Sequence, residues 1–494
     1  MPIAAYRVNR SLALLTVLAL LASLFVALSA TPAFADSVVV EVEFDSAPGV
    51  GDCDGAGDCT LRAAIEKANA DGDVDTVVVP AGTYTLTEGS ISVTDDLTLV
   101  GATGDRADVV IVGATPGGSG ILEVSSERFT LADLTMRDGD SDLGGALYHE
   151  ADIDLLEVDN VAFYDNVSTD GGAIYIETFA GDRIVSVTGS HFESNDGGDY
   201  GGGISAWGVA DLLVSGSTFI DNQADEGGAV LIWYEEEDEA ATLVNNVFRA
   251  NTAVYGGALL AWYIDLEIVG SEFSGNAADY GGAVYLEEPR ETVIANSTFS
   301  GNSASDEGGA IYHEPHDDGE DTLLHHVTIA DSTGDGVAAD DGATVLLGNT
   351  IIAGSDGSDC AGDGPFVSLG GNIDGDGSCG LSEDSDQPGT DPGLLALADY
   401  GGPTQTRAIA ESSAAYEAGE NAICLAIDQR GVERKDDCDS GAFELVPAVD
   451  VPDDEDDGDD DEDDDAEEQD DDVHDSIAEA TPATPVAAQP DFTG

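Results

Sequence analysis

A Gly-Gly pair recurs along the middle of this chain at nearly constant spacing, and it limits the folds open to the chain. Each pair is followed by Ala or Gly and then by an aliphatic residue, and successive copies begin 25 to 30 residues apart. A repeat of this length predicts a solenoid, because one unit is too short to enclose a core of its own. The copies begin at Gly144, Gly171, Gly201, Gly227, Gly256, Gly281 and Gly308.

A second motif, Phe-x-x-Asn, precedes six of these pairs and completes the unit. Each unit reads as a short strand, the Phe-x-x-Asn motif, a polar turn, the glycines and a second strand. Stacked coils about 4.8 Å apart bury the phenylalanines and align the asparagines in an amide ladder. We predict an all-β chain built on about seven such parallel β-helix coils. The motifs are Phe163/Asn166, Phe192/Asn195, Phe219/Asn222, Phe248/Asn251, Phe273/Asn276 and Phe299/Asn302.

Together the two motifs resemble the repeat of the chlamydial polymorphic outer-membrane proteins. The resemblance covers residues 144 to 315. It implies a right-handed parallel β-helix of the pectin-lyase type, which we place at residues 101–355. On this interpretation most of the repeated residues are scaffold, and function is expected where the repeat is broken.

The first 35 residues are typical of a secretory signal. Two arginines supply the positive end, residues 12–28 form an uncharged apolar run, and residues 33–35 (Ala-Phe-Ala) are a small-x-small cleavage site. Cleavage before Asp36 is favoured, and an uncleaved anchor is the alternative. We expect Sec export to the exterior or to the cell surface. No later segment is apolar enough to span a bilayer, so no integral membrane segment is expected in the mature chain.

Residues 36–100 are predicted to form an N-terminal cap and the first strands. Residues 59–65 (Cys-Thr-Leu-Arg-Ala-Ala-Ile) are similar to the Cys-Ser-Leu-Arg-Glu-Ala segment of bacterial and archaeal surface proteins, with Thr60 and Ala63 in place of its Ser and Glu. The apolar spacing predicts one short helix over the open first coil, followed by strands at 76–79 and 83–86.

The C-terminal residues 356–446 resemble the choice-of-anchor Q-type domain of surface proteins. The matching segments are 397–404 (Leu-Ala-Asp-Tyr-Gly-Gly-Pro-Thr), 428–431 (Asp-Gln-Arg-Gly) and 438–444 (Cys-Asp-Ser-Gly-Ala-Phe-Glu). The resemblance implies display at a cell surface. Residues 447–494 are acidic and then rich in Thr, Pro and Ala, so their composition predicts a disordered tail and leaves anchoring or release open.

The charge of the chain restricts its partners. A formal net charge of −87, with only 14 Lys and Arg, repels nucleic acid, anionic membranes and polyanionic substrates. We expect a monomer whose partner is a glycan or a surface protein.

Six cysteines lie outside the repeats, and an even count in an exported chain predicts disulfides. Several pairings are possible, and the local one is the simplest. It joins Cys53 with Cys59, Cys360 with Cys379, and Cys424 with Cys438.

The strand after each Gly-Gly pair carries the most informative departure from the repeat. Strand alternation places its first and third residues inward and its second and fourth outward. The outward residues are mostly Tyr and Glu at both ends of the stack, including Tyr175 and Tyr285. On three middle coils the fourth residue is Trp207, Trp233 or Trp262, and these are the protein's 3 tryptophans.

Three tryptophans on consecutive coils predict a flat aromatic strip that binds a glycan or a protein partner, since contiguous exposed apolar surface marks interaction sites. The alternative is that a covering segment buries the strip. Residues 235–239 and the C-terminal module are the candidates for that cover. A purely structural surface-layer spacer is a further alternative for the whole chain.

An enzyme is the remaining alternative, either a polysaccharide lyase or a glycoside hydrolase. Glu150 with Glu177, or Glu287 with Glu314, would lie one coil apart, near the roughly 5 Å separation of a retaining glycosidase pair. Stacked glutamates are also what a solvated face produces by repetition. A lyase needs a basic residue, and these strands contain no Arg or Lys.

One segment has the spacing of a calcium loop. Asn372, Asp374, Asp376 and Glu383 occupy its first, third, fifth and twelfth positions, and oxygen ligands at those positions suit calcium. A tight Gly/Asp turn beside the Cys360–Cys379 disulfide is the alternative. We expect no other cofactor.

Overall fold

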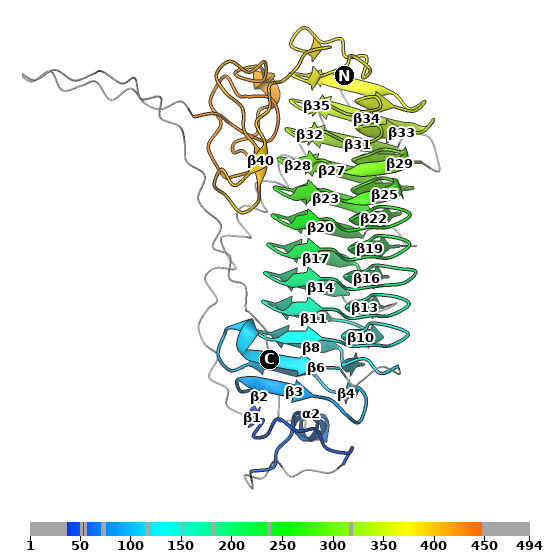
Figure 1. Cartoon of the computed structure of the whole chain (residues 1–494), viewed down its shortest axis with the longest axis vertical. Coiled ribbons are helices and arrows are strands. Elements are labelled where there is room, and N and C mark those ends of the chain that lie inside the picture. Colours follow the sequence, from blue (N-terminus) through cyan, green and yellow to red (C-terminus); the bar gives the residue numbers. More distant parts are fainter. Residues whose placement is uncertain are drawn as a thin grey trace, which may run out of the picture. The chain divides into compact units, whose positions relative to one another are not determined.

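The chain folds into a parallel β-helix, seen in a computed structural model that describes residues 37–49, 53, 57–70, 76–113, 118–150, 152–178, 183–234, 239–315 and 320–446. Three long parallel sheets, here called A, B and C, run along the stack, and each coil in its middle contributes one strand to each (Figure 1). The predicted signal at 1–35 and the predicted tail at 447–494 lie outside the described residues.

Sheet A has 13 strands. They are β1 (Ser37–Val39), β2 (Thr76–Val79), β5 (Leu97–Gly101), β8 (Arg128–Ala132), β11 (Leu155–Asp159), β14 (Ile184–Thr188), β17 (Asp211–Ser215), β20 (Ala240–Val244), β23 (Asp265–Val269), β27 (Glu291–Ala295), β31 (Glu320–His325), β34 (Ala343–Gly348) and β37 (Phe366–Gly370).

Sheet B also has 13 strands. They are β3 (Gly82–Thr85), β6 (Val109–Val112), β9 (Thr135–Arg137), β12 (Ala162–Tyr164), β15 (His191–Glu193), β18 (Thr218–Ile220), β21 (Val247–Arg249), β24 (Glu272–Ser274), β28 (Thr298–Ser300), β32 (Thr328–Ala330), β35 (Ile351–Ala353), β38 (Ile373–Asp374) and β39 (Gln387–Pro388).

Sheet C has 11 strands, and the strands that follow the Gly-Gly pairs belong to it. They are β4 (Ile91–Val93), β7 (Leu122–Val124), β10 (Leu147–Glu150), β13 (Ile174–Glu177), β16 (Ile204–Trp207), β19 (Val230–Trp233), β22 (Leu259–Trp262), β26 (Val284–Glu287), β30 (Ile311–Glu314), β33 (Val337–Ala339) and β36 (Cys360–Ala361).

Short elements complete the fold. The 10-residue helix α2 (Leu61–Ala70) buries its apolar face at the N-terminal end and confirms the predicted cap helix. The predicted strand at 76–79 is β2, and the one at 83–86 is β3, one residue earlier. The others are β25 (Ala277–Tyr280), β29 (Ser303–Glu307), β40 (Leu397–Ala398), β41 (Thr406–Arg407) and the 3-10 turns η1 (Arg106–Asp108) and η2 (Asn421–Ile423).

The stack is longer than the seven coils predicted from the Gly-Gly pair. Strands of the same three sheets precede the first pair and follow the last one. The coil at β7 keeps only the second glycine of the pair, Gly120, and the coil at β33 has Asp335 in that register, so a search for the pair misses them. Both glycines are constrained: Gly171 has a φ of +67° and a Cβ there would meet the carbonyl oxygen of Ile174 at 2.4 Å, and a Cβ on Gly172 would meet that of Gly202 at 2.1 Å.

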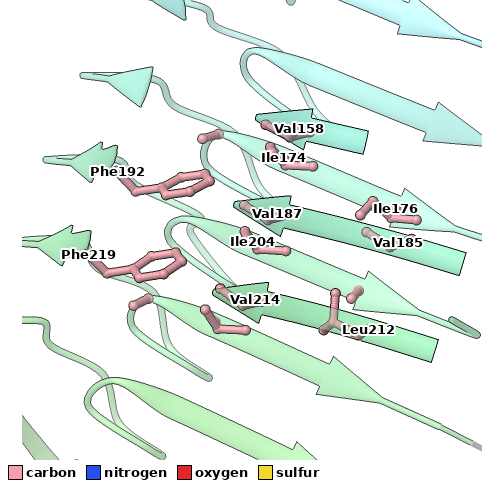
Figure 2. Packing of buried hydrophobic residues seen from close by; sticks show 14 of the residues in the cluster. Val158, Ile174, Ile176, Val185, Val187, Phe192, Ile204, Leu212, Val214 and Phe219 are labelled. Carbon is pink, nitrogen blue, oxygen red and sulfur yellow. The ribbon is translucent and has the colours of Figure 1, made fainter. Parts of the chain in front are cut away.

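Two internal ladders hold the coils in register, as predicted from the Phe-x-x-Asn motif. Consecutive phenylalanine rings stack inside the coil, with centroids of Phe192 and Phe219 4.6 Å apart (Figure 2). The buried asparagines form the second ladder. The Nδ2 of Asn195 donates to Oδ1 of Asn222 at 2.9 Å and to the carbonyl of Phe163 at 3.1 Å, so the turn leaves few buried polar groups unpaired.

The C-terminal module packs against the side of the stack where strands of sheet B lie. The side chain of Gln429 accepts a hydrogen bond from Thr298 of β28 at 2.5 Å. Arg434, whose side chain is 0% exposed, pairs with Glu444 at 3.4 Å and donates to Oδ1 of Asn296 at 3.0 Å. Gln429 and Arg434 therefore hold the C-terminal module against the stack.

The three local disulfides, Cys53–Cys59, Cys360–Cys379 and Cys424–Cys438, are all formed. They lie in the N-terminal cap, the last coils and the C-terminal module. No helix within the described ranges is long and apolar enough to cross a membrane.

Candidate functional site

The outer face of sheet C is the candidate site, and strand register arranges it in columns. Leu231 pairs with Leu260, and Trp233 pairs with Trp262, so equivalent outward residues of successive coils lie directly side by side. The first and third residues of each strand are buried in the coil, as predicted; Val230 and Ile232 are both fully buried.

The tryptophan strip, defined as Trp207, Trp233 and Trp262, forms the middle of the fourth-residue column. Ring centroids are 4.9 Å apart between Trp207 and Trp233 and 4.1 Å apart between Trp233 and Trp262. All three side chains are half-buried. The indole N–H of Trp207 donates to Oγ of Ser205 at 2.8 Å, which fixes that ring against its own strand.

Beneath the strip lies a second hydrophobic cluster, separate from the coil interior. Leu231 and Leu260 belong to it and are fully buried, although strand alternation turns them outward. The strip packs on them from one side. Tyrosines from the turns pack on the cluster as well, and Tyr200 meets Trp207 edge-on at 5.3 Å. The predicted flat strip is instead a column of indoles that face one another, with ring edges outward over the buried leucines.

The tyrosines of the turns were not predicted from the sequence. They are Tyr200, Tyr255 and Tyr280, each directly before a Gly-Gly pair, and they share that column with acidic residues such as Asp170 and Glu226. The sequence does contain a signal for these tyrosines, because Tyr-Gly-Gly occurs at three of the seven pairs. A comparison of only the residues after the glycines leaves out the residue before them.

The other predicted aromatic ligands, Tyr175 and Tyr285, are 7% and 3% exposed. Their rings are therefore buried in the face and leave mainly ring edges and hydroxyl groups for a ligand. The Tyr175 hydroxyl donates to Glu177 of its own strand at 3.2 Å. The Tyr285 hydroxyl donates to Glu314 on the next coil.

The four predicted carboxylates continue the column of the strip at its two ends. Glu150 pairs in register with Glu177, and Glu287 pairs with Glu314. Burial raises the pKa of Glu287 to about 7, and the neighbouring charges of Glu314, Glu226 and Glu288 act in the same direction. Glu287 therefore differs from an ordinary solvated glutamate.

The predicted calcium ligands separate in the structure. Asp374 and Asp376 come together with Asp359, which the spacing argument did not include. Asn372 is 1% exposed, and its amide instead accepts from the backbone N–H of Thr350 at 2.9 Å and donates to Leu347 O at 2.9 Å. Glu383 is exposed.

The aspartate cluster has a structural explanation. The two oxygens of Asp374 accept backbone N–H groups of Gly377 and Cys379, both at 2.9 Å. Asp359 and Asp376 accept each other's backbone N–H at 3.0 and 3.2 Å. These bonds satisfy the turn beside the Cys360–Cys379 disulfide, which is the alternative given above for the calcium spacing.

Comparison with known proteins identifies the repeat. Residues 160–177 and 296–314 match the Chlamydia polymorphic membrane protein repeat, so the chain carries copies of that repeat, as its motifs indicated. No curated protein matches the sequence.

Among solved structures, the chain is similar to a pectate lyase, Pel9A, with 12% identity, a TM-score of 0.43, and coverage of 83% of this chain and 97% of the lyase. It is also similar to the surface protein and adhesin PfbA of Streptococcus pneumoniae, with 12% identity, a TM-score of 0.31, and coverage of 66% and 95%. Against the bacteriophage CBA120 tailspike protein 3 the values are 16% identity, a TM-score of 0.34 and coverage of 65%, and the chain spans 60% of that protein's length. These likenesses carry no information on the chemistry of the site.

Proposed function

We propose that this protein is displayed outside the cell and binds a neutral glycan through the tryptophan strip. The observation that carries the proposal is the run of three half-buried indoles on consecutive coils, with tyrosines on one side and carboxylates at both ends. The outer edges of the stacked indoles offer apolar surface to the C–H groups of a sugar. Carboxylate oxygens accept hydrogen bonds from its hydroxyl groups.

The size of the strip favours a narrow linear ligand over a folded partner. Three coils spaced about 4.8 Å apart span about 10 Å. A stable protein interface buries about 800 Å² on each partner, which is a much larger area than three indoles provide. The spacing between coils also suits a linear chain of sugars that runs along the stack, with one sugar on each coil.

The charge of the chain favours a neutral ligand. Glu150, Glu177, Glu287 and Glu314 flank the strip, and the whole chain carries a formal net charge of −87. A polyuronate would approach against this field and would bind only when salt screens it.

Affinity electrophoresis tests the proposal with gels containing xyloglucan, galactomannan, laminarin or dextran, with polygalacturonate as the charged comparison. We expect retardation in at least one neutral gel and its loss in Trp233→Ala. The matched control is Tyr164→Ala, which removes a half-buried aromatic ring from sheet B. Absence of retardation in every neutral gel, or retention of it in Trp233→Ala, would contradict the proposal.

Display outside the cell rests on the predicted signal and on the repeat shared with chlamydial polymorphic membrane proteins. An antibody raised against the β-helix should label intact cells of the source organism or detect the protein in the culture medium. Detection only after lysis would contradict this part of the proposal.

A further inference from the structure

The column that contains the tryptophan strip continues into a pair of carboxyl groups with different surroundings. Trp262 pairs in register with Glu287, and Glu287 pairs with Glu314. A ligand that lies along the strip and extends two coils further therefore reaches both carboxyl groups. The strand spacing sets their backbones about 4.8 Å apart.

The tyrosine hydroxyls at this end of the stack reach forward by one coil. Tyr285 donates to Glu314, and Tyr312 donates to Asp340 at 3.0 Å. The coil before Glu287 carries Leu260 at the tyrosine position, so no hydroxyl reaches Glu287 from there. Within the described part of the chain, no hydrogen bond to the Glu287 carboxyl group is found.

This asymmetry separates the two carboxyl groups chemically. Glu314 accepts a hydrogen bond from the Tyr285 hydroxyl. Glu287 is partly desolvated, and its pKa is raised to about 7, so a large fraction of it keeps its proton near neutral pH. A carboxyl group that keeps its proton beside a second carboxyl group is the arrangement that glycoside cleavage uses for its general acid and nucleophile.

We propose that Glu287 and Glu314 hydrolyse the neutral glycan held by the tryptophan strip, with Glu287 as the acid and Glu314 as the nucleophile. This inference rests on the proposed glycan binding and adds a reaction to it. The separation of one coil matches the roughly 5 Å of retaining enzymes better than the roughly 6.5–9.5 Å of inverting ones. The substrate class is a neutral polysaccharide, and the anomeric configuration of the product is the same as that of the bond cleaved.

The reaction proceeds in two steps. In the first, the Glu314 carboxylate attacks the anomeric carbon while the Glu287 carboxyl group gives its proton to the glycosidic oxygen. The C–O bond breaks, a glycosyl ester forms on Glu314, and the leaving sugar departs with a hydroxyl group. In the second, water attacks the anomeric carbon, Glu287 takes back a proton, and Glu314 is released as a carboxylate. One glycosidic bond and one water yield two sugar ends.

The test uses the full mature chain and any neutral polysaccharide that retards it in the gels described above. Release of reducing ends is measured for the natural chain, Glu287→Gln and Glu314→Gln. We expect each variant to lower the rate about 100- to 10,000-fold while gel retardation is kept. The control is Glu157→Gln on sheet A, whose carboxylate likewise accepts a hydroxyl hydrogen bond across a coil boundary, from Thr130 at 3.1 Å. It should leave the rate unchanged.

The outcomes distinguish the two proposals. Retardation without reducing-end release by the natural chain overturns the hydrolysis and leaves the binding intact. Release that persists in both glutamine variants assigns the activity elsewhere and also overturns the inference. Absence of retardation removes the binding proposal and the hydrolysis with it. Circular dichroism melting of each variant separates loss of a catalytic group from loss of the fold.

Discussion

The hydroxyl group of Tyr285 bonds to Glu314 on the next coil, whereas the equivalent hydroxyl of Tyr175 bonds to Glu177 on its own coil. Both tyrosines occupy the second position of a sheet C strand, so the repeat does not dictate the partner. The difference leaves Glu287 without a tyrosine donor, next to Trp262 and the buried Leu260. A change of hydrogen-bond partner for one tyrosine is thus enough to change the surroundings of a neighbouring carboxyl group.

The first prediction concerns the pH dependence of stability at Glu287. Its pKa is raised to about 7 by burial and by Glu314, Glu226 and Glu288. Between its ordinary pKa and that value the folded chain binds more protons than the unfolded chain. Stability from this group is therefore present at low pH and is lost as pH rises. Glu287→Gln should melt at increasingly higher temperature than the natural chain from about pH 5 to about pH 8.

Differential scanning calorimetry across this pH range checks the prediction. The control is Glu157→Gln, which replaces a carboxylate on sheet A that accepts a hydrogen bond from Thr130. A melting difference for Glu287→Gln that stays constant with pH would contradict the raised pKa of Glu287.

The second prediction concerns the asparagine ladder. Asn222 is fully buried and accepts from both the backbone and the side chain of Asn195, at 3.1 and 2.9 Å. Asn222→Ala leaves buried donors without partners and should lower the free energy of unfolding by about 1–3 kcal/mol. Gln223→Ala, at the exposed neighbouring position, should change it by less than about 0.5 kcal/mol. Urea unfolding followed by circular dichroism measures both, and equal effects would contradict the role given to the ladder.

The scaffold was predictable because each motif residue occupies the same position in every coil. Phe219 and Asn222 recur with little change, and the periodicity alone indicates stacking of like residues in a solenoid. The ends of the stack were not predictable by the same argument. The coil at β7 keeps only Gly120 of the pair, and the coil at β33 has Asp335 in place of the second glycine, so the fold continues with a weaker sequence signal.

The candidate site was only partly predictable, for physical reasons. Strand alternation places Trp233 on the outer face, but it cannot say that Tyr200 and Tyr255 reach the same cluster from a turn, where side-chain direction follows no period. For a related reason, the spacing typical of a calcium loop did not predict which side chains lie together. Position along the chain does not show that the amide of Asn372 is used inside the coil.

The third prediction concerns the attachment of the C-terminal module. Arg434 is 0% exposed, and burial lowers its pKa to about 10 although Glu444, Asp428 and Asp439 surround it. Arg434→Met removes the contacts to Glu444 and to the stack at Asn296 and leaves buried carboxylates without their cation. The module should lose about 3–5 kcal/mol of stability.

Hydrogen exchange resolved by peptide mass measures that loss. Peptides from residues 397–446 should exchange faster in Arg434→Met, and peptides from the middle coils should not. The control is Arg137→Met, because the Arg137–Asp138 pair lies on the surface with side chains 45% and 44% exposed. An exposed pair contributes less than about 1 kcal/mol, so no segment should respond. Uniform exchange changes along the whole chain would contradict the view that the module is held mainly by this contact.

The fourth prediction uses the order of the three indoles. Trp233 lies between Trp207 and Trp262 and covers a face of each, at 4.9 and 4.1 Å. Trp233→Ala should therefore expose one more face on both remaining rings, whereas Trp262→Ala exposes one face of Trp233 only. Acrylamide quenching of the intact protein should be moderate because all three rings are half-buried. It should rise more in Trp233→Ala than in Trp262→Ala. Strong protection in the intact protein would mean that another segment covers the strip, and the binding proposal would lose its surface.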